Sequence, residues 1–381
     1  MSGQPGPGGA PGFGASDLRD SGSAGAPVPV GPGIDEHARE SGEPGGEEGA
    51  AVDEATRREP EGEASAGLPA GFANRQVTVE VPGTTANLGA GYDALAMALD
   101  MANRVTVEVL DEPGIELTVE GEGADSLAPD RTNRLVVALE TGIRWALGEV
   151  PSGIGWRVSM TNAIPLARGL GSSAAATVAG LVAADTLTGG VLDQRRLLAL
   201  ASEIEGHADN ATAALLGGFV VVALVDGWPE AVRFDVPRSL RAVLFVPDRG
   251  LATNLMRAAL PHQVPHRDAV FNVGRAALMV AGIASGHHEL LRAGTEDRLH
   301  EAYRATAYPE LPDMVRAARD AGALGACLSG AGSTVIAFGD SMAQLAAIQQ
   351  AFVAAAVDHD LPGRVELVAL RNAGAIVVSA R

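Results

Sequence analysis

The chain has 381 residues, and its 47 acidic side chains outnumber its 28 basic ones, giving a net charge of −19. This excess of negative charge disfavours nucleic acid and anionic membranes as partners, and no apolar run is long enough to cross a bilayer. All 28 basic residues are arginine, which excludes a P-loop because that motif needs a lysine. Residues 1–20 lack the features of a secretory signal, and the lone Cys327 permits no internal disulfide, so we expect a cytoplasmic protein.

Residues 1–72 differ in composition from the rest of the chain. They hold 17 Gly and 9 Pro, and 13 acidic residues against 4 Arg. Such a composition cannot bury enough apolar surface to fold. We therefore expect a disordered acidic Gly/Pro-rich tail over 1–72, to which we assign no role.

The folded part is expected to begin at Arg75. Alternation of apolar and polar residues predicts strands at 76–81, 105–110, 115–119 and 156–160, and helical spacing predicts a helix at 133–147. Segment 171–187 is small and apolar on nearly every face, which indicates a buried helix. The elements that follow are helix 193–205, strands 219–225 and 242–246, several helices within 254–293, helix 313–321, strands 324–328 and 334–338, helix 342–357 and strand 364–370.

Strands and helices mix without strict alternation, which favours an α+β fold over a doubly wound parallel sheet. The last elements follow the order α-β-β-α-β, typical of a split βαβ plan. We expect two domains, at 75–226 and 227–381.

Segment 165–176 leads through a glycine-rich loop into the buried helix. Gly169 and Gly171 let the backbone approach a ligand closely, Ser172 and Ser173 offer hydroxyls, and the helix start presents unpaired N–H groups. These features predict an anion site, most naturally for phosphate. The segment also fits the dinucleotide fingerprint, but residues 161–168 separate it from its strand and the required acidic residue is missing, so an NAD-dependent dehydrogenase is disfavoured.

Two further glycine clusters allow two interpretations each. Segment 82–93 follows the first strand, where Asn87 and Asp93 either reach a small ligand or close an Asx turn. Segment 328–334 lies between two predicted strands, and a tight hairpin is sufficient to explain it.

Three charged residues are candidates for ligand binding. Glu205 ends a predicted helix at the unfavourable end of its dipole, where it is either solvated or paired with a cation such as Mg²⁺. Arg257 and Arg304 are either surface charges or bidentate partners of a carboxylate.

Taken in order, these motifs resemble those of the GHMP small-molecule kinases, and within them the homoserine kinases. The resemblance covers the chain from about Val77 to its end. It is carried by 85–93 (TANLGAGYD), 169–175 (GLGSSAA) and 329–333 (SGAGS), with 206–210 (GHADN) and 215–219 (LLGGF) indicating the homoserine kinases.

The resemblance implies a two-domain α+β fold, with an N-terminal nucleotide-binding domain and a ferredoxin-like C-terminal domain, acting as a homodimer. It implies phosphorylation of L-homoserine in threonine biosynthesis, with ATP and Mg²⁺. ATP would contact Pro165, Arg168, Gly169, Leu170, Gly171, Ser172, Ser173, Ala174, Ala175, Gly330 and Gly332, and the metal would be held by Ser173 and Glu205. L-Homoserine would contact Asn87, Asp93, Asp209, Thr253, Arg257 and Arg304, with Asn210, Ser173 and Glu205 as the catalytic residues.

Asn210 stands where many relatives carry an aspartate base, so the substrate hydroxyl would attack without a dedicated base. A mevalonate-type kinase is expected to carry that aspartate, so Asn210 argues against this alternative. A non-catalytic ligand sensor would not need Ser173 and Glu205, so their presence argues against that alternative. Three departures from the family pattern are Tyr92 for Phe, Ser333 for Pro, and 211–213 (ATA) for Val-Ala-Pro. We expect Ser333 to loosen the third glycine loop.

Overall fold

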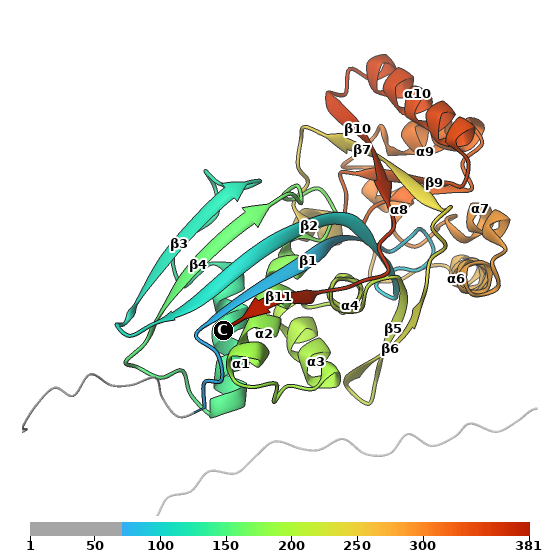
Figure 1. Cartoon of the computed structure of the whole chain (residues 1–381). Coiled ribbons are helices and arrows are strands. Elements are labelled where there is room, and N and C mark those ends of the chain that lie inside the picture. The colour runs from blue at the N-terminus through green and yellow to red at the C-terminus, as the bar shows by residue number, and fades with distance from the viewer. Residues whose placement is uncertain (1–70) are drawn as a thin grey trace, which may run out of the picture. The chain divides into compact units, whose positions relative to one another are not determined.

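The computed structural model describes residues 71–381 (Figure 1). The predicted tail therefore lies outside the described residues, except for its last two positions. Phe72 packs against Trp156 with 6.3 Å between ring centroids. The folded part thus begins before Arg75, slightly earlier than the sequence indicated.

The larger sheet of residues 71–381 has seven strands in the order β11-β1-β2-β4-β3, with β5 joining β2 and β6 joining β5. Only β3 and β4 are parallel among these pairs. The strands are β1 (Gln76–Ala86), β2 (Leu95–Leu110), β3 (Gly114–Gly121), β4 (Gly155–Asn162), β5 (Phe219–Val225), β6 (Trp228–Phe234) and β11 (Ile376–Ala380).

Helices cover one face of this sheet (Figure 1). They are α1 (Arg134–Leu147), α2 (Ser172–Leu187), α3 (Gln194–Glu205) and α4 (Asp209–Leu216). Asn133 and Asp193 cap α1 and α3 by accepting backbone N–H bonds at 3.0 and 2.8 Å. Helix α2 is buried on nearly every side, as predicted, and small residues allow α1 to approach it closely: a Cβ on Gly142 would lie 2.6 Å from that of Ala184.

The smaller sheet is fully antiparallel, in the order β10-β7-β9-β8. This order and its covering helices confirm the predicted ferredoxin-like plan. Its strands are β7 (Arg241–Pro247), β8 (Gly325–Leu328), β9 (Val335–Gly339) and β10 (Gly363–Ala369), and its main helices are α9 (Leu311–Asp320) and α10 (Met342–Asp358).

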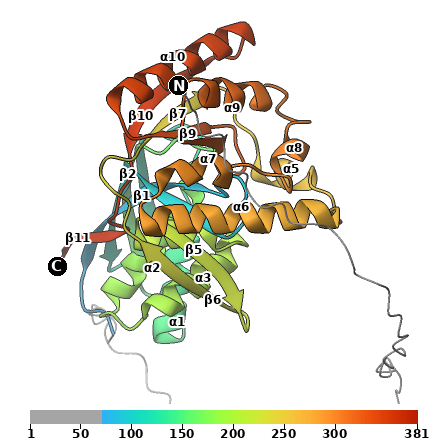
Figure 2. The ribbon, with the colours of Figure 1, turned by 90° about the vertical axis from the view of Figure 1, so that its right-hand side faces the viewer.

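A 20-residue helix and several short helices lie between β7 and α9. They are α5 (Thr253–Ala258), α6 (His266–Ser285), η1 (His288–Leu290), α7 (Leu291–Gly294) and α8 (Glu301–Arg304). Figure 2 shows α6 crossing the molecule below α7. None of the helices within 71–381 is long and apolar enough to span a membrane.

Four elements escaped the sequence analysis: β6, α4, α8 and β11, together with the first half of β2. The first strand was also predicted too short, because β1 continues from 81 to Ala86 through the start of the segment assigned to a glycine loop. The expected domain boundary at 226/227 falls in the turn between β5 and β6, although both strands belong to the larger sheet. The last strand, β11, also returns to that sheet and pairs with β1. The second half of the chain therefore contributes strands to both sheets.

Candidate active site

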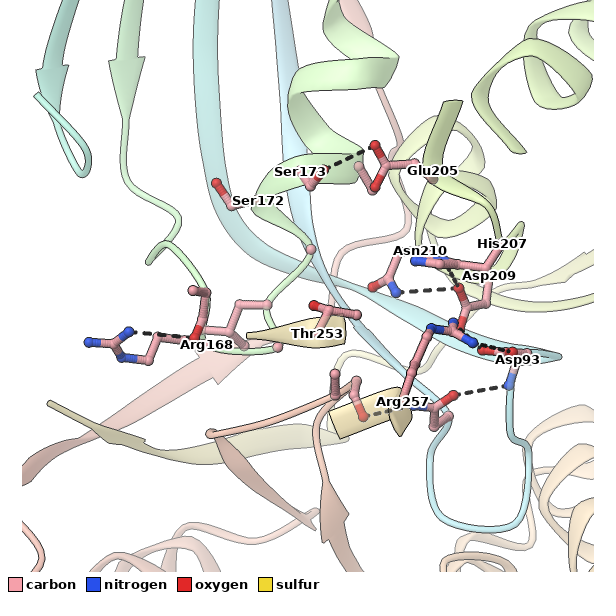
Figure 3. A pocket seen from close by; sticks show the side chains of 18 of the residues that line it. Asp93, Arg168, Ser172, Ser173, Glu205, His207, Asp209, Asn210, Thr253 and Arg257 are labelled. Atoms are coloured by element: carbon pink, nitrogen blue, oxygen red, sulfur yellow. Dashed lines mark hydrogen bonds and ion pairs between the residues drawn. The ribbon is translucent and has the colours of Figure 1, made fainter. Parts of the chain in front are cut away.

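Helix ends and loops from both halves of the chain line one cavity of about 240 Å³ (Figure 3). All candidate substrate, catalytic and metal residues line it, as do most candidate ATP residues. Ala175 and Gly332 are the two candidates that do not line it. Arg134, Ala167, His207 and Ala331 line it without having been singled out as site residues.

The glycine loop before α2 forms one wall of the cavity. Gly171 is the N-cap of α2 with φ of 72°, and it supplies no side-chain cap. The N–H groups of Ser172 and Ser173 therefore have no backbone acceptor in the described part of the chain. A Cβ at Gly169 would overlap the Ser329 carbonyl, and one at Gly171 would overlap the Thr84 hydroxyl. Only glycine permits this close packing, which directs open amides into the cavity.

Arg168 lies in the same loop, but its guanidinium does not point into the cavity (Figure 3). Nε donates to the Pro247 carbonyl at 2.7 Å, Nη1 to Leu166 at 3.0 Å, and Nη2 to Asp248. These bonds fasten the glycine loop to the end of β7. The guanidinium of Arg168 is occupied by these backbone carbonyls, and the predicted ATP contact at this position stays a prediction.

Glu205 ends α3 beside the start of α2. Its Oε1 accepts hydrogen bonds from Ser173 at 3.0 Å and Thr177 at 2.6 Å, and its side chain is only 5% exposed. Arg134 Nε lies 3.9 Å away. Oε2 has no hydrogen-bond partner among the described residues, so one carboxylate oxygen and the Ser173 hydroxyl face the anion site.

This donor set suits Mg²⁺, which keeps several waters and is commonly bound by one or two carboxylates together with substrate phosphates. A dedicated cage is lacking, because residues 71–381 hold no group of three or more His, Cys, Asp or Glu with suitable spacing. The donors present thus fit a metal ion that completes its coordination with phosphate oxygens and water.

Asn210 and Asp209 begin α4 in the middle of the cavity. Asn210 Oδ1 accepts a hydrogen bond from Thr84 at 2.7 Å, which ties it to β1. Asp209 Oδ1 lies 2.7 Å from the Asn210 N–H and 2.8 Å from His207 Nδ1. The bond to this buried carboxylate raises the pKa of His207. Both side chains of the Asp209-Asn210 pair are held in fixed orientations.

The far end of the cavity is charged. Arg257 makes a two-pronged ion pair with Asp93, at 2.8 and 3.0 Å (Figure 3). Its Nη1 also lies 3.1 Å from the Tyr92 hydroxyl. Arg304 is 1% exposed, and its Nη1 donates to the Gly330 carbonyl at 3.0 Å. Two guanidinium groups and one carboxylate thus converge here.

Asn87 shapes the loop between β1 and β2 that carries Asp93. Its Nδ2 donates to the Gly330 carbonyl at 2.7 Å, and its Oδ1 accepts from the Asp93 N–H at 3.0 Å. Both residues have positive φ, 67° for Asn87 and 52° for Asp93. The Asn87 side chain therefore joins the first and third glycine motifs and closes its own loop through the Asp93 N–H. The predicted contact of Asn87 and Asp93 with a ligand stays a prediction.

Comparison with known proteins gives a consistent assignment. Family models for the GHMP kinases N terminal domain and the GHMP kinases C terminal match residues 134–218 and 279–358. The homoserine kinase of Caldicellulosiruptor bescii is 39% identical over 305 residues, covering 80% of this chain and 97% of that protein. The chain belongs to the homoserine kinase family.

Further comparisons agree with this family. The homoserine kinase of Streptomyces coelicolor is 45% identical over 273 residues, covering 71% of this chain and 86% of that protein. The crystal structure of homoserine kinase from Cytophaga hutchinsonii aligns with a TM-score of 0.72 at 30% identity, covering 80% of this chain and 98% of that one. The predicted family and fold are confirmed.

Two of the three departures from the family pattern have structural explanations. The Tyr92 hydroxyl contacts Arg257, a contact that phenylalanine lacks. Ser333 is fully buried and its hydroxyl donates to the Arg249 carbonyl at 2.7 Å. This hydrogen bond anchors the loop and so opposes the loosening that we expected from the replacement of proline, which stays a prediction. His207 lies within the GHADN motif, which was the available signal for its place in the cavity.

Proposed function

We propose that this homoserine kinase family member transfers the γ-phosphoryl group of ATP to the side-chain hydroxyl of L-homoserine, forming O-phospho-L-homoserine for threonine biosynthesis. The observation that carries the proposal is the convergence of Asp93, Arg257 and Arg304 in the cavity that the α2 N-terminus also lines. One end of this cavity suits a polyphosphate and the other suits a small zwitterion.

The anion end would hold the phosphates of ATP. The backbone amides at the start of α2 and the hydroxyls of Ser172 and Ser173 supply donors, and the helix dipole adds a favourable field. The third glycine loop closes this wall, since Ser329 Oγ donates to the Gly169 carbonyl at 2.7 Å. Preorganised donors of this kind stabilise the charge that develops during phosphoryl transfer.

Ser173 and Glu205 would hold Mg²⁺ through the hydroxyl and the available Oε2. When bound, the ion neutralises phosphate charge and helps align the phosphates for transfer. Thr177 keeps the Glu205 carboxylate in place through its 2.6 Å hydrogen bond.

The charged end would hold the amino acid. In the ligand-free protein Asp93 and Arg257 satisfy each other. A bound zwitterion would break this ion pair and form two others. Its ammonium group would pair with Asp93, and its carboxylate would pair with Arg257 and Arg304. Bidentate guanidinium binding fixes the carboxylate in direction as well as position.

Asn210 and Asp209 would orient the substrate hydroxyl toward the phosphate. A loose phosphoryl-transfer transition state depends on alignment and charge neutralisation more than on early deprotonation. The amide of Asn210 therefore suffices, held by its 2.7 Å bond to Thr84.

A coupled ADP-release assay tests the proposal, with L-homoserine, L-serine, mevalonate and galactose supplied in parallel. We expect efficient turnover of L-homoserine alone. Faster turnover of mevalonate would favour the mevalonate-type alternative, although mevalonate has no ammonium group to pair with the Asp93 carboxylate. Binding of L-homoserine without ADP release in the presence of Mg²⁺ would identify a sensor.

We further infer a cytoplasmic homodimer of two-domain chains, in which β6 and β11 from beyond residue 226 belong to the N-terminal domain. We expect neither nucleic acid nor a membrane as a partner. The net charge of −19 supports the latter exclusion. Light scattering during size-exclusion chromatography tests the oligomeric state: a mass of two chains is expected, and a mass of one would refute it.

A further inference from the structure

A buried histidine lies directly behind the charged end of the cavity. His300 is fully buried at the start of α8. Its Nδ1 lies 3.1 Å from Arg304 Nη1, and its Nε2 lies 2.8 Å from the Gly89 carbonyl. Its ring packs against Tyr92 with 5.2 Å between centroids. One imidazole therefore touches both the arginine and the loop that form the proposed amino-acid site.

The partners of His300 determine where its proton resides. An arginine only donates hydrogen bonds, so Nδ1 must accept from Arg304 and carry no proton. The Gly89 carbonyl only accepts, so Nε2 must carry the proton. The ring is thus neutral, in agreement with burial, which lowers the pKa of His300 to about 4. A second proton would place two donors and two positive charges against each other.

The turn that carries His300 is itself fixed. Asp297 accepts hydrogen bonds from the backbone N–H groups of His300 and Glu301 at 2.8 and 2.7 Å. Asn272 of α6 donates to Asp297 Oδ1 at 2.7 Å. The backbone that carries the imidazole is therefore held in place by Asp297 and Asn272, independently of the cavity.

We propose that His300 is a positioning residue: as the neutral Nε2–H tautomer it aims Arg304 into the cavity and anchors the Asn87–Asp93 loop, so that one side chain sets both charged ends of the substrate site. This inference rests on the proposed function. The position of Arg304, which would bind the substrate carboxylate, depends on its hydrogen bond to Nδ1. The position of Asp93, which would bind the substrate ammonium group, depends on the hydrogen bond from Nε2 to Gly89 in the same loop. Neither role requires His300 to touch the substrate.

Two conservative variants separate these roles in the full-length protein. In His300→Asn the side-chain oxygen can occupy the Nδ1 position and accept from Arg304, but the bond to Gly89 is lost. In His300→Gln the side-chain nitrogen can reach the Nε2 position and donate to Gly89, but Nδ1 has no equivalent. Each variant keeps one of the two contacts.

Matched ligands then report on each contact. 4-Hydroxybutanoate is homoserine without its ammonium group, and 3-aminopropan-1-ol is homoserine without its carboxylate; both are measured as competitive inhibitors. We expect His300→Gln to weaken 4-hydroxybutanoate by about tenfold and to leave 3-aminopropan-1-ol within about twofold. His300→Asn should show the reverse. In both variants the KM for L-homoserine should rise while the KM for ATP stays near the wild-type value.

Glu301→Gln is the matched control, because Glu301 lies on the same turn, is partly buried and accepts a hydrogen bond from the Leu328 N–H on the side of β8. It should leave the inhibition constants of both ligands unchanged. If either His300 variant loses only thermal stability, with both inhibition constants unchanged, His300 is merely structural and the inference fails.

A measurement on the unaltered protein covers the case in which a variant does not fold. Nitrogen NMR of ¹⁵N-histidine-labelled wild-type protein should show His300 with a protonated Nε2 and a bare Nδ1 at pH 7; the opposite tautomer or an imidazolium overturns the inference. The proposed function fails separately, if wild-type protein releases no ADP with L-homoserine.

Discussion

Replacement of Arg257 by alanine probes the exchange of ion pairs on which substrate binding depends. Arg257 and Asp93 are 35% and 33% exposed and bind each other through two hydrogen bonds. Binding of L-homoserine would release this pair and give each residue a substrate partner. The variant loses the carboxylate contact, but it also no longer has to break the ion pair.

The structure allows the net effect to be estimated. Hydrogen bonds to a charged group contribute about 1.5–3 kcal/mol. A partly exposed ion pair contributes about 0.2–1 kcal/mol, which the variant recovers. The difference, about 1–2 kcal/mol, corresponds to an increase of about 5–30-fold in the KM for L-homoserine. The KM for ATP should change little, because the start of α2 is unaltered.

The assay is steady-state ADP release with each substrate varied in turn. Arg257→Lys should show an intermediate KM, because it keeps the charge but loses the fork. Arg195→Ala serves as the control, since its exposed pair with Glu230 lies outside the cavity. Equal increases in both KM values, or an unchanged KM for L-homoserine, would refute the assignment of Arg257 to the carboxylate.

Three further outcomes follow from the same structure. Gly171→Ala should abolish ATP turnover and lower the unfolding temperature, because the new Cβ would overlap the Thr84 hydroxyl at a residue with φ of 72°. The control is Gly190→Ala, which has φ of 79° but open space around it and should lose only about 1–2 kcal/mol of stability. Similar losses of stability in both variants would count against the close packing at Gly171. Glu205→Gln should depress kcat and raise the Mg²⁺ concentration needed for half-maximal rate, and an unchanged Mg²⁺ titration would contradict its role as a ligand. Burial raises the pKa of Glu301 from 4.5 to about 8, so its contribution to stability is complete below pH 4.5 and is lost as the pH rises toward 8, by about 1.4 kcal/mol per pH unit. Urea unfolding of wild-type protein and Glu301→Gln across this range should differ in slope accordingly, and parallel curves would contradict the buried neutral acid.

Local patterns in the sequence were sufficient for most elements of the fold. The all-round apolar character of 171–187 and the helical spacing of 133–147 are local signals, and the structure confirms both helices. The missed elements lack such signals. β11 is a run of five exposed residues whose strand state depends on pairing with β1, and the first half of β2 is mostly buried without alternation.

The sequence predicted most of the residues that line the cavity, but it did not predict the contacts between them. Motifs indicated which segments would line the cavity, because Gly, Ser, Asn and Asp have local conformational reasons to occur there. The partner of Arg257 is Asp93, which is 164 positions away in the chain, and a local pattern cannot show such a contact. For the same reason the sequence did not reveal that Arg168 braces backbone carbonyls or that His300 supports Arg304.

The pairing of β11 with β1 has a consequence for synthesis of the protein. The Arg381 N–H donates to the Gln76 carbonyl at 3.0 Å, and the Arg75 N–H donates to the Arg381 carbonyl at 2.7 Å. During translation one edge of β1 therefore lacks its hydrogen-bonding partner until residues 376–381 have been synthesised and have left the ribosome. An uncovered strand edge invites association with other nascent chains. Shortening the chain by its last few residues should leave the catalytic groups intact yet lower the yield of soluble protein.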